Sequence, residues 1–337
     1  MSKRPSPISA TVDFEADGVQ HGFLKLPISH DESAWGAVMI PVTVVKNGAG
    51  PTALLTGGNH GDEYEGITTL LKLASELEAG EVSGRVIIVP MMNAPAAMAG
   101  RRTSPMDGGN LNRSFPGDPD GTVTERIADY FTRVMTPMCD VVLDLHSGGR
   151  TLDIIPFGAS HVLENPEQQR QALEGAKAFG APYAMMMFEL DAAALFDTAV
   201  ESQGKVFVAT ELGGGGTSTP ESLAITERGV RNFLIHFGLV QGEVEMPAEP
   251  QVYLDMPDAS CYVQSEHSGL LELTLALGDE VEKGQVIARV YDMTRSGTPP
   301  VEYRAGRSGI LAARRFPAQV GMGDTLAVIA EVVDSLG

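Results

Sequence analysis

The chain has few cysteines, little positive charge and no long apolar run. Its two cysteines, Cys139 and Cys261, are too few and too far apart for a disulfide framework or a thiolate metal cluster. Lysine and arginine number 24 against 44 acidic residues, which gives a formal net charge of -20 and repels nucleic acid. No apolar segment reaches the roughly 18 residues that span a membrane, and the first residues lack the apolar core of a secretory signal. We therefore expect a cytoplasmic protein that binds neither nucleic acid nor a membrane.

The rest of the composition is that of a globular protein. Hydrophobic residues make up 43% of the 337 residues and charged residues 20%, which is ordinary for a folded domain. The length is sufficient for one large domain and a smaller one. We expect a main domain over residues 1–245, whose first ~45 residues form a β-rich segment, and a second domain over residues 255–337.

The middle of the chain alternates between short apolar runs and amphipathic segments. These patterns predict strands over residues 52–58, 84–90, 139–149 and 205–216, and helices over residues 63–80, 122–135, 164–180, 191–204 and 219–238. Gly80 is expected to end the first helix. The alternation predicts an α/β fold, in which a mixed, mostly parallel sheet has helices on both faces. Sites in such sheets form beyond the carboxyl ends of the strands, where three of these strands run into polar loops.

The C-terminal part of the chain has a different sequence pattern. Residues 241–260 are proline-rich and acidic, as in a linker or a crossover. A repeat follows whose two copies begin at Ser268 and Ser308, with Gly284 and Gly323 in matching turns. Two similar β-units predict a small barrel-sandwich domain, similar to one half of biotinyl and lipoyl carrier domains. Neither hairpin has a lysine at its tip, so we expect this domain to cap a site rather than carry a prosthetic group.

The first polar loop, "GGNHGDEYEG", carries His60 and Glu63 between a predicted strand and a predicted helix. An imidazole nitrogen and a carboxylate oxygen are both ligands for zinc, whose catalytic sites use three protein ligands. This pair alone is weak evidence, because acidic residues at the start of a helix also suit the helix dipole in a solvated loop.

The second polar loop begins at His146. In "LDLHSGG" the strand alternation places Asp144 and His146 on one face, with His146 at the carboxyl end. A hydrogen-bonded core histidine is the alternative interpretation. Together with His60 and Glu63, however, His146 completes a His₂Glu set, a pattern known from catalytic zinc sites. The set predicts one zinc ion per chain, although another divalent ion fits the same residues.

The third polar loop begins at Glu211, which ends the apolar strand "VFVAT". A carboxylate there is costly unless it meets a partner or a site. Beside a metal-activated water, Glu211 could act as general base and then as general acid. The alternative is a strand-end glutamate in a structural ion pair.

The loop over residues 100–117 concentrates arginines in an otherwise acidic protein. It contains Arg101, Arg102 and Arg113, with Asn112 beside the last of them. Arginines in such a loop suit bidentate capture of a carboxylate. A solvated face is the alternative.

Four ordered motifs carry a resemblance to a known family. "GGNHGDEYEG", "NLNRSFPG", "LDLHSGG" and "ATELGG" resemble the succinylglutamate desuccinylase/aspartoacylase family of zinc-dependent amidohydrolases, which is related in fold to the zinc carboxypeptidases. The resemblance implies that His60, Glu63 and His146 bind zinc and that Glu211 is the catalytic glutamate.

The same resemblance assigns the loop residues. Asn112 and Arg113 look like the pair that holds the substrate's carboxylate. Either Arg101 or Arg102 matches the arginine that supports the scissile carbonyl, and we prefer Arg102. The longer form "GRRTSPMDGGNLNRSFPG" resembles the branch that includes the N-α-acetyl-diaminobutyrate deacetylases of ectoine degradation.

These features predict an enzyme, a hydrolase of linear amide bonds. We expect it to remove an acyl group, most simply acetyl, from a small N-acyl amino acid such as N-α-acetyl-L-2,4-diaminobutyrate, and to form a homo-oligomer. The alternatives are a zinc carboxypeptidase that acts on small peptides, since an Asn-Arg pair also grips a peptide's terminal carboxylate, and a non-catalytic binding protein with a metal-stabilised fold.

Overall fold

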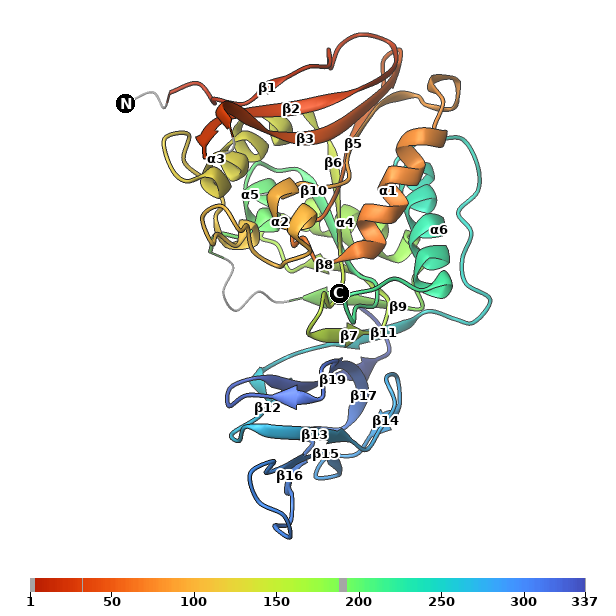
Figure 1. Cartoon of the computed structure of the whole chain (residues 1–337). Coiled ribbons are helices and arrows are strands. Elements are labelled where there is room, and N and C mark those ends of the chain that lie inside the picture. Colours follow the sequence, from red (N-terminus) through yellow and green to blue (C-terminus); the bar gives the residue numbers. More distant parts are fainter. Residues whose placement is uncertain (1–3, 32, 188–192, 337) are drawn as a thin grey trace.

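The computed structural model describes residues 4–31, 33–187 and 193–336, and it is built around a large mixed sheet (Figure 1). Within these residues the sheet has 15 strands, and its main path runs β1-β2-β3-β5-β4-β6-β10-β8-β9-β11-β19-β17-β14. Four adjacent strands at the centre are parallel: β5 (Gly84–Val89), β4 (Thr52–Gly57), β6 (Val141–His146) and β10 (Val206–Glu211). β8 pairs in parallel with β9, and β9 with β11, whereas the other strand pairs are antiparallel. The expected α/β class with a mixed sheet is therefore confirmed, but "mostly parallel" does not hold for the whole sheet.

The N-terminal segment forms the antiparallel end of the sheet. It consists of β1 (Ser9–Ala10), β2 (Gly18–His30) and β3 (Ser33–Asn47), and β3 pairs with β5. The β-rich start that the sequence predicts is therefore present.

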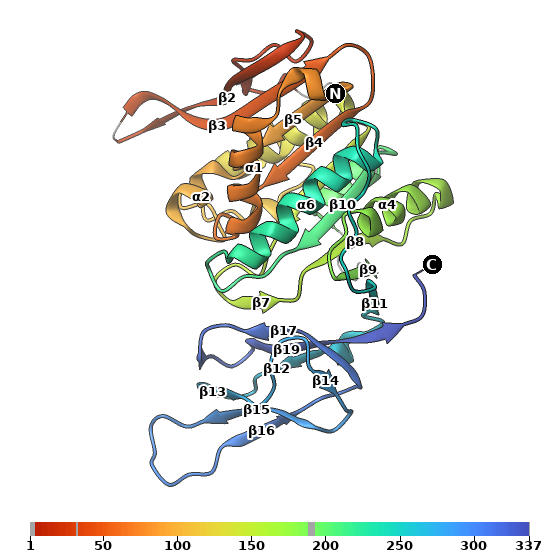
Figure 2. The ribbon, with the colours of Figure 1, turned by 90° about the vertical axis from the view of Figure 1, so that its right-hand side faces the viewer.

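Helices cover both faces of the central strands (Figure 2). On one face α2 (Ala94–Ala99), α3 (Val123–Tyr130) and α5 (Phe196–Glu201) bury side chains in a core that includes Val142 of β6. On the other face α1 (Tyr64–Glu76), α4 (Pro166–Ala178) and α6 (Pro220–His236) pack over a core that includes Leu143 and Leu145. Alternate residues of β6 therefore face opposite cores, as expected of a strand.

Several helix boundaries differ from the predictions. α3 ends at Tyr130, and a π-helical segment over Phe131–Met135 completes the predicted range. The first helix ends at Glu76 and not at Gly80, which lies in a separate 3₁₀ turn over Ala79–Glu81. The chain turns extended at Leu77, whose side chain is buried in the core below α1. The predicted helix over residues 191–204 is α5 alone, and the first residues of that range lie outside the described part of the chain.

The sheet continues into the C-terminal part through residues that the sequence suggested were a linker. β10 pairs with β8 (Phe157–His161), which pairs with β9 (Tyr183–Met187). β11 (Val252–Asp255) lies between β9 and β19 (Thr325–Val333) and joins the two parts of the protein. The linker prediction is therefore wrong for β11.

The predicted repeat is visible in the strand pairing. The first unit contains β13 (Gly269–Leu273), β14 (Glu280–Val281) and β15 (Val286–Tyr291), and the second contains β17 (Gly309–Arg315), β18 (Gln319–Val320) and β19. The short strand of each unit pairs with the first strand of the other, β14 with β17 and β18 with β13. Gly284 and Gly323 adopt φ values of 85° and 90° in the matching turns, a conformation that favours glycine.

Three further strands complete the C-terminal part: β7 (Leu152–Ile154), β12 (Tyr262–Gln264) and β16 (Val301–Arg304). β7 comes from the main domain but pairs with β17. Cys139 and Cys261 are both buried and free. Among the described helices, none combines the length and hydropathy of a membrane span.

Candidate active site

His60 and Glu63 lie in the short turn between β4 and α1. Gly61 is required there, because a Cβ at this position would lie 2.1 Å from the backbone of Ala96 in α2. Glu63 is the N-cap residue of α1, but its carboxylate makes no capping hydrogen bond. It points instead toward two imidazoles, and its side chain is only 3% exposed.

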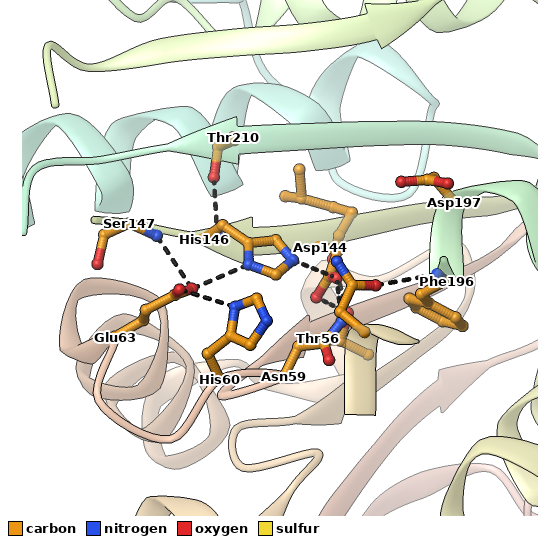
Figure 3. A network of polar contacts seen from close by, with 12 residues as sticks. Thr56, Asn59, His60, Glu63, Asp144, His146, Ser147, Phe196, Asp197 and Thr210 are labelled. Atoms are coloured by element: carbon orange, nitrogen blue, oxygen red, sulfur yellow. Dashed lines mark hydrogen bonds and ion pairs between the residues drawn. The ribbon is translucent and has the colours of Figure 1, made fainter. Parts of the chain in front are cut away.

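The Glu63 carboxylate lies between His60 and His146 (Figure 3). Its Oε1 is 2.8 Å from Nδ1 of His60, and its Oε2 is 2.9 Å from Nδ1 of His146. The backbone N–H of Ser147 donates to Oε2 at 3.2 Å. The structure therefore brings the three predicted ligand residues together from the end of β4, the start of α1 and the end of β6.

Asp144 orients His146 from behind. Its Oδ2 is 2.8 Å from Nε2 of His146 and accepts a hydrogen bond from the Asn59 amide at 3.1 Å, while the Thr56 hydroxyl donates to Oδ1 at 2.6 Å. A carboxylate in this position fixes the ring and leaves Nδ1 to act as the ligand atom. The strand alternation predicts that Asp144 shares a face with His146, but no role for Asp144 was predicted, although a spacing of two residues along a strand indicates this contact.

The local charges set the protonation of this cluster. Burial acts to raise the pKa of Glu63, but the charges of His60 and His146 lower it well below its usual range. Burial acts to lower the pKa of His146, yet the carboxylates of Asp144 and Glu63 raise it well above its ordinary value. Burial lowers the pKa of His60. Glu63 is therefore an ionised carboxylate, the form in which it can bind a cation.

These residues fit a zinc ion. Among the described residues they form the one group of three or more potential ligands whose donor atoms all lie within 4.8 Å of one another. Two imidazoles and one carboxylate are a donor set used by catalytic zinc sites. A harder cation such as Mg²⁺ prefers oxygen donors, so the two nitrogen donors favour zinc.

Glu211 lies next to this group. It ends β10, and in the parallel pairing with β6 its register partner is His146. Its Oε2 atom is buried and accepts no hydrogen bond from the described residues. Burial, reinforced by the charge of Glu63, raises the pKa of Glu211 to about 8. This oxygen is therefore not held in a hydrogen-bonded ion pair within the described residues.

The arginine-containing loop over residues 100–117 contributes side chains to the same site. Arg102 Nη1 is 3.3 Å from Glu63 Oε1, and both Arg102 and Arg113 line the cavity. Arg101 is exposed and is not among the residues that line the cavity. Asn112 also lines the cavity, and its amide oxygen accepts a hydrogen bond from the backbone N–H of Phe196 at 3.0 Å.

The cluster opens into a cavity of about 410 Å³. Its walls include residues from both parts of the protein, and the C-terminal part contributes Met256, Tyr262, Ala312, Ala313 and Val328. The pairing of β7 with β17 holds the two parts together beside the cavity. A cavity of this size suits a small molecule.

Three further polar residues lie near the ligand cluster or in the cavity wall. The amide oxygen of Asn110 is 3.2 Å from Nε2 of His60. His161 and Asp197 line the cavity, and His161 Nδ1 is 2.8 Å from the Glu201 carboxylate. His161 ends β8, which runs antiparallel to β10 in the sheet. Because the start of β8, Phe157, is the register partner of Glu211, the rule that the carboxyl ends of parallel strands share an edge does not predict the position of His161.

Comparison with known proteins agrees with this geometry. Residues 49–237 match the model of the succinylglutamate desuccinylase/aspartoacylase catalytic domain. The chain belongs to this family. A curated relative from Halomonas elongata, N-alpha-acetyl-L-2,4-diaminobutyric acid deacetylase, is 84% identical over 335 residues, which cover 99% of this chain and 98% of that protein.

Solved structures of the family resemble the whole chain. The product-bound ectoine utilization protein EutE (DoeB) from Ruegeria pomeroyi has 56% sequence identity and a TM-score of 0.95, over 97% of this chain and all (100%) of that one. A succinylglutamate desuccinylase from Silicibacter sp. also has 56% sequence identity and a TM-score of 0.95, over 98% of this chain and 100% of that one. The likeness to family members therefore includes the C-terminal part, which lies beyond the matched catalytic domain.

Proposed function

We propose that this protein is a zinc-dependent deacetylase that hydrolyses the amide bond of N-α-acetyl-L-2,4-diaminobutyrate. The observation that carries the proposal is the 84% identity to the Halomonas deacetylase along almost the full length of both chains. The site supports it, because His60, Glu63 and His146 form a group suited to zinc, with Glu211 beside them.

The roles of the ligand residues follow from their contacts. His60 and His146 present Nδ1, and Glu63 presents its carboxylate, toward one point. Asp144 and Asn110 keep the two rings in place through their Nε2 atoms. Zinc bound there would supply a Lewis acid for the acyl carbonyl and a lowered pKa for the attacking water.

Glu211 carries the proton transfers in this proposal. Its Oε2, which accepts no hydrogen bond from the described residues, takes a proton from the water as the water attacks the acetyl carbon. The same carboxyl then gives that proton to the leaving amine nitrogen, so the C–N bond breaks as acetate and a free amine form. Arg102, beside Glu63, faces the negative charge that develops on the carbonyl oxygen.

The loop residues place the substrate. Asn112 and Arg113 line the cavity, where an amide N–H and a guanidinium can hold the α-carboxylate. The amide oxygen of Asn112 accepts from Phe196, and this bond turns its NH₂ group away from that backbone. A fixed carboxylate sets the distance of the scissile amide from Glu211.

The C-terminal part caps the cavity in this proposal, which favours small N-acyl amino acids over peptides. Support comes from its contribution to the cavity walls and from the modest volume of about 410 Å³. A cytoplasmic location and assembly into a homo-oligomer stay predictions from the sequence.

The test compares two substrates with zinc-loaded protein. We expect release of acetate and L-2,4-diaminobutyrate from N-α-acetyl-L-2,4-diaminobutyrate, and no release of the C-terminal amino acid from an N-blocked dipeptide. Cleavage of the dipeptide with no acetate release would show that the protein is a carboxypeptidase. A protein that binds zinc but cleaves neither substrate would be a binding protein.

A further inference from the structure

The geometry points to Asp197 as the residue that selects a substrate with a positively charged side chain. This inference rests on the proposed function, and it names the group that distinguishes 2,4-diaminobutyrate from the neutral and acidic amino acids of similar size.

Asp197 lies in the cavity wall. It is the second residue of α5, is 8% exposed and lines the same cavity as the zinc-binding group. Figure 3 shows it beside Phe196, away from the Glu63 end of the cluster. Its Oδ1 accepts hydrogen bonds from the backbone N–H and the hydroxyl of Thr198, which fix the orientation of the carboxylate.

The position of Asp197 relative to the substrate follows from Asn112. The hydrogen bond between the Asn112 amide oxygen and the Phe196 N–H is 3.0 Å long, and Asp197 is the next residue after Phe196. Adjacent Cα atoms are about 3.8 Å apart, so Asp197 lies next to the residue that we assign to the α-carboxylate. The substrate's side chain and its α-carboxylate are attached to the same Cα atom of the substrate. The side chain therefore begins within reach of Asp197.

The other charged residues of the cavity wall already have roles. Among the described residues the acidic ones are Glu63, Asp144, Asp197 and Glu211. Glu63 faces the two histidines, Asp144 holds His146 and Glu211 is the proposed base. Asp197 is the acidic group that the mechanism leaves unassigned.

The charge of Asp197 suits an ammonium group. The side chain of 2,4-diaminobutyrate ends in such a group two carbons from Cα, and a hydrogen bond between two charged groups is stronger than one between neutral groups. A carboxylate in the cavity wall also repels a side-chain carboxylate, so it selects against acidic amino acids. Asp197 is a binding residue in this scheme and takes no part in the proton transfers.

The experiment measures kcat/KM for N-α-acetyl-L-2,4-diaminobutyrate and for N-α-acetyl-L-norvaline, in which a methyl replaces the ammonium. We expect Asp197→Asn to lower the value for the cationic substrate about 10- to 150-fold, the range for a hydrogen bond to a charged group. The kcat/KM of the variant for the norvaline derivative should stay within about three-fold of the wild-type value, because the asparagine side-chain oxygen can still accept the hydrogen bonds from Thr198. N-acetyl-L-aspartate should become a better substrate of the variant.

Two controls separate charge recognition from structural damage. Glu167→Gln removes a carboxylate from the first turn of α4, where the side chain is 58% exposed, and should leave the substrate preference unchanged. Asp197→Glu keeps the charge and should keep a preference for the cationic substrate. If Asp197→Asn does not fold, loss of the preference in a folded Asp197→Ser variant would support the inference equally.

Several results would overturn the inference. An equal loss on both substrates, or an unchanged preference in Asp197→Asn, would show that the ammonium is recognised elsewhere. If the wild-type protein hydrolyses neither substrate, the proposed function fails, and the inference is judged by calorimetry with free L-2,4-diaminobutyrate and L-norvaline. A preference for the diamino acid that disappears in Asp197→Asn would then support it, and equal binding of both amino acids would refute it.

Discussion

Replacement of Glu211 by glutamine tests the proposed base directly. Glutamine keeps the size of the side chain but cannot take a proton from water. General base catalysis typically contributes 10²–10⁴-fold, or about 3 to 5 kcal/mol of barrier. We expect Glu211→Gln to lower kcat for N-α-acetyl-L-2,4-diaminobutyrate by this factor, with zinc content and KM close to those of the wild type.

The structure also predicts the sign of the stability change. Oε2 of Glu211 is buried and accepts no hydrogen bond from the described residues, and the charge of Glu63 acts to raise the pKa of Glu211. A pKa of about 8 leaves the Glu211 carboxyl largely uncharged at neutral pH, so its replacement by a neutral amide of the same size removes no favourable ion pair and costs little stability. We therefore expect the melting temperature of Glu211→Gln to equal or exceed that of the wild type.

The assay measures kcat, zinc content and melting temperature on the same preparation of each protein. If Glu211 were a structural ion-pair partner, the variant would melt at a lower temperature and its folded fraction would retain most of its kcat. Turnover within a few-fold of the wild type in a zinc-loaded variant would refute the role of Glu211 as the base.

Two further variants test the residues around the base. Arg113→Ala should raise KM for N-acetyl amino acids and change kcat much less, because the α-carboxylate loses its guanidinium partner; steady-state kinetics with unchanged KM would show that this loop binds something else. Asp144→Asn should weaken zinc binding about 10- to 100-fold, because the residue orients His146. Titration with a competing chelator measures this change, and unchanged affinity would show that Asp144 does not support the ligand.

The sequence was most informative where buried strands end in polar residues. Continuous apolar runs identify β4, β6 and β10, and the carboxyl ends of parallel neighbours meet at one edge. For this reason His60, His146 and Glu211 could be placed together although they are far apart in the chain. The repeat of the C-terminal part was equally visible, because matching turns require glycine at a positive φ.

Contacts between loops could not be predicted from periodicity. The choice between Arg101 and Arg102 depends on which side of the loop faces Glu63, and adjacent residues in a loop have no fixed orientation. Asp197 lies near Asn112 because the N–H of Phe196 donates to the Asn112 amide oxygen, a bond that joins segments 84 residues apart. β11 was missed because a strand of four residues in a proline-rich stretch is too short to show an alternating pattern.

The central claim is that hydrolysis depends on a metal ion held by His60, Glu63 and His146. The most direct test is elemental analysis of the purified protein together with acetate release from N-α-acetyl-L-2,4-diaminobutyrate before and after removal of the metal. We predict about one zinc per chain, activity that is lost with the metal and restored by zinc, and neither zinc nor activity in His60→Ala and His146→Ala. Full metal content in both variants, or undiminished acetate release by the metal-free protein, would contradict the account.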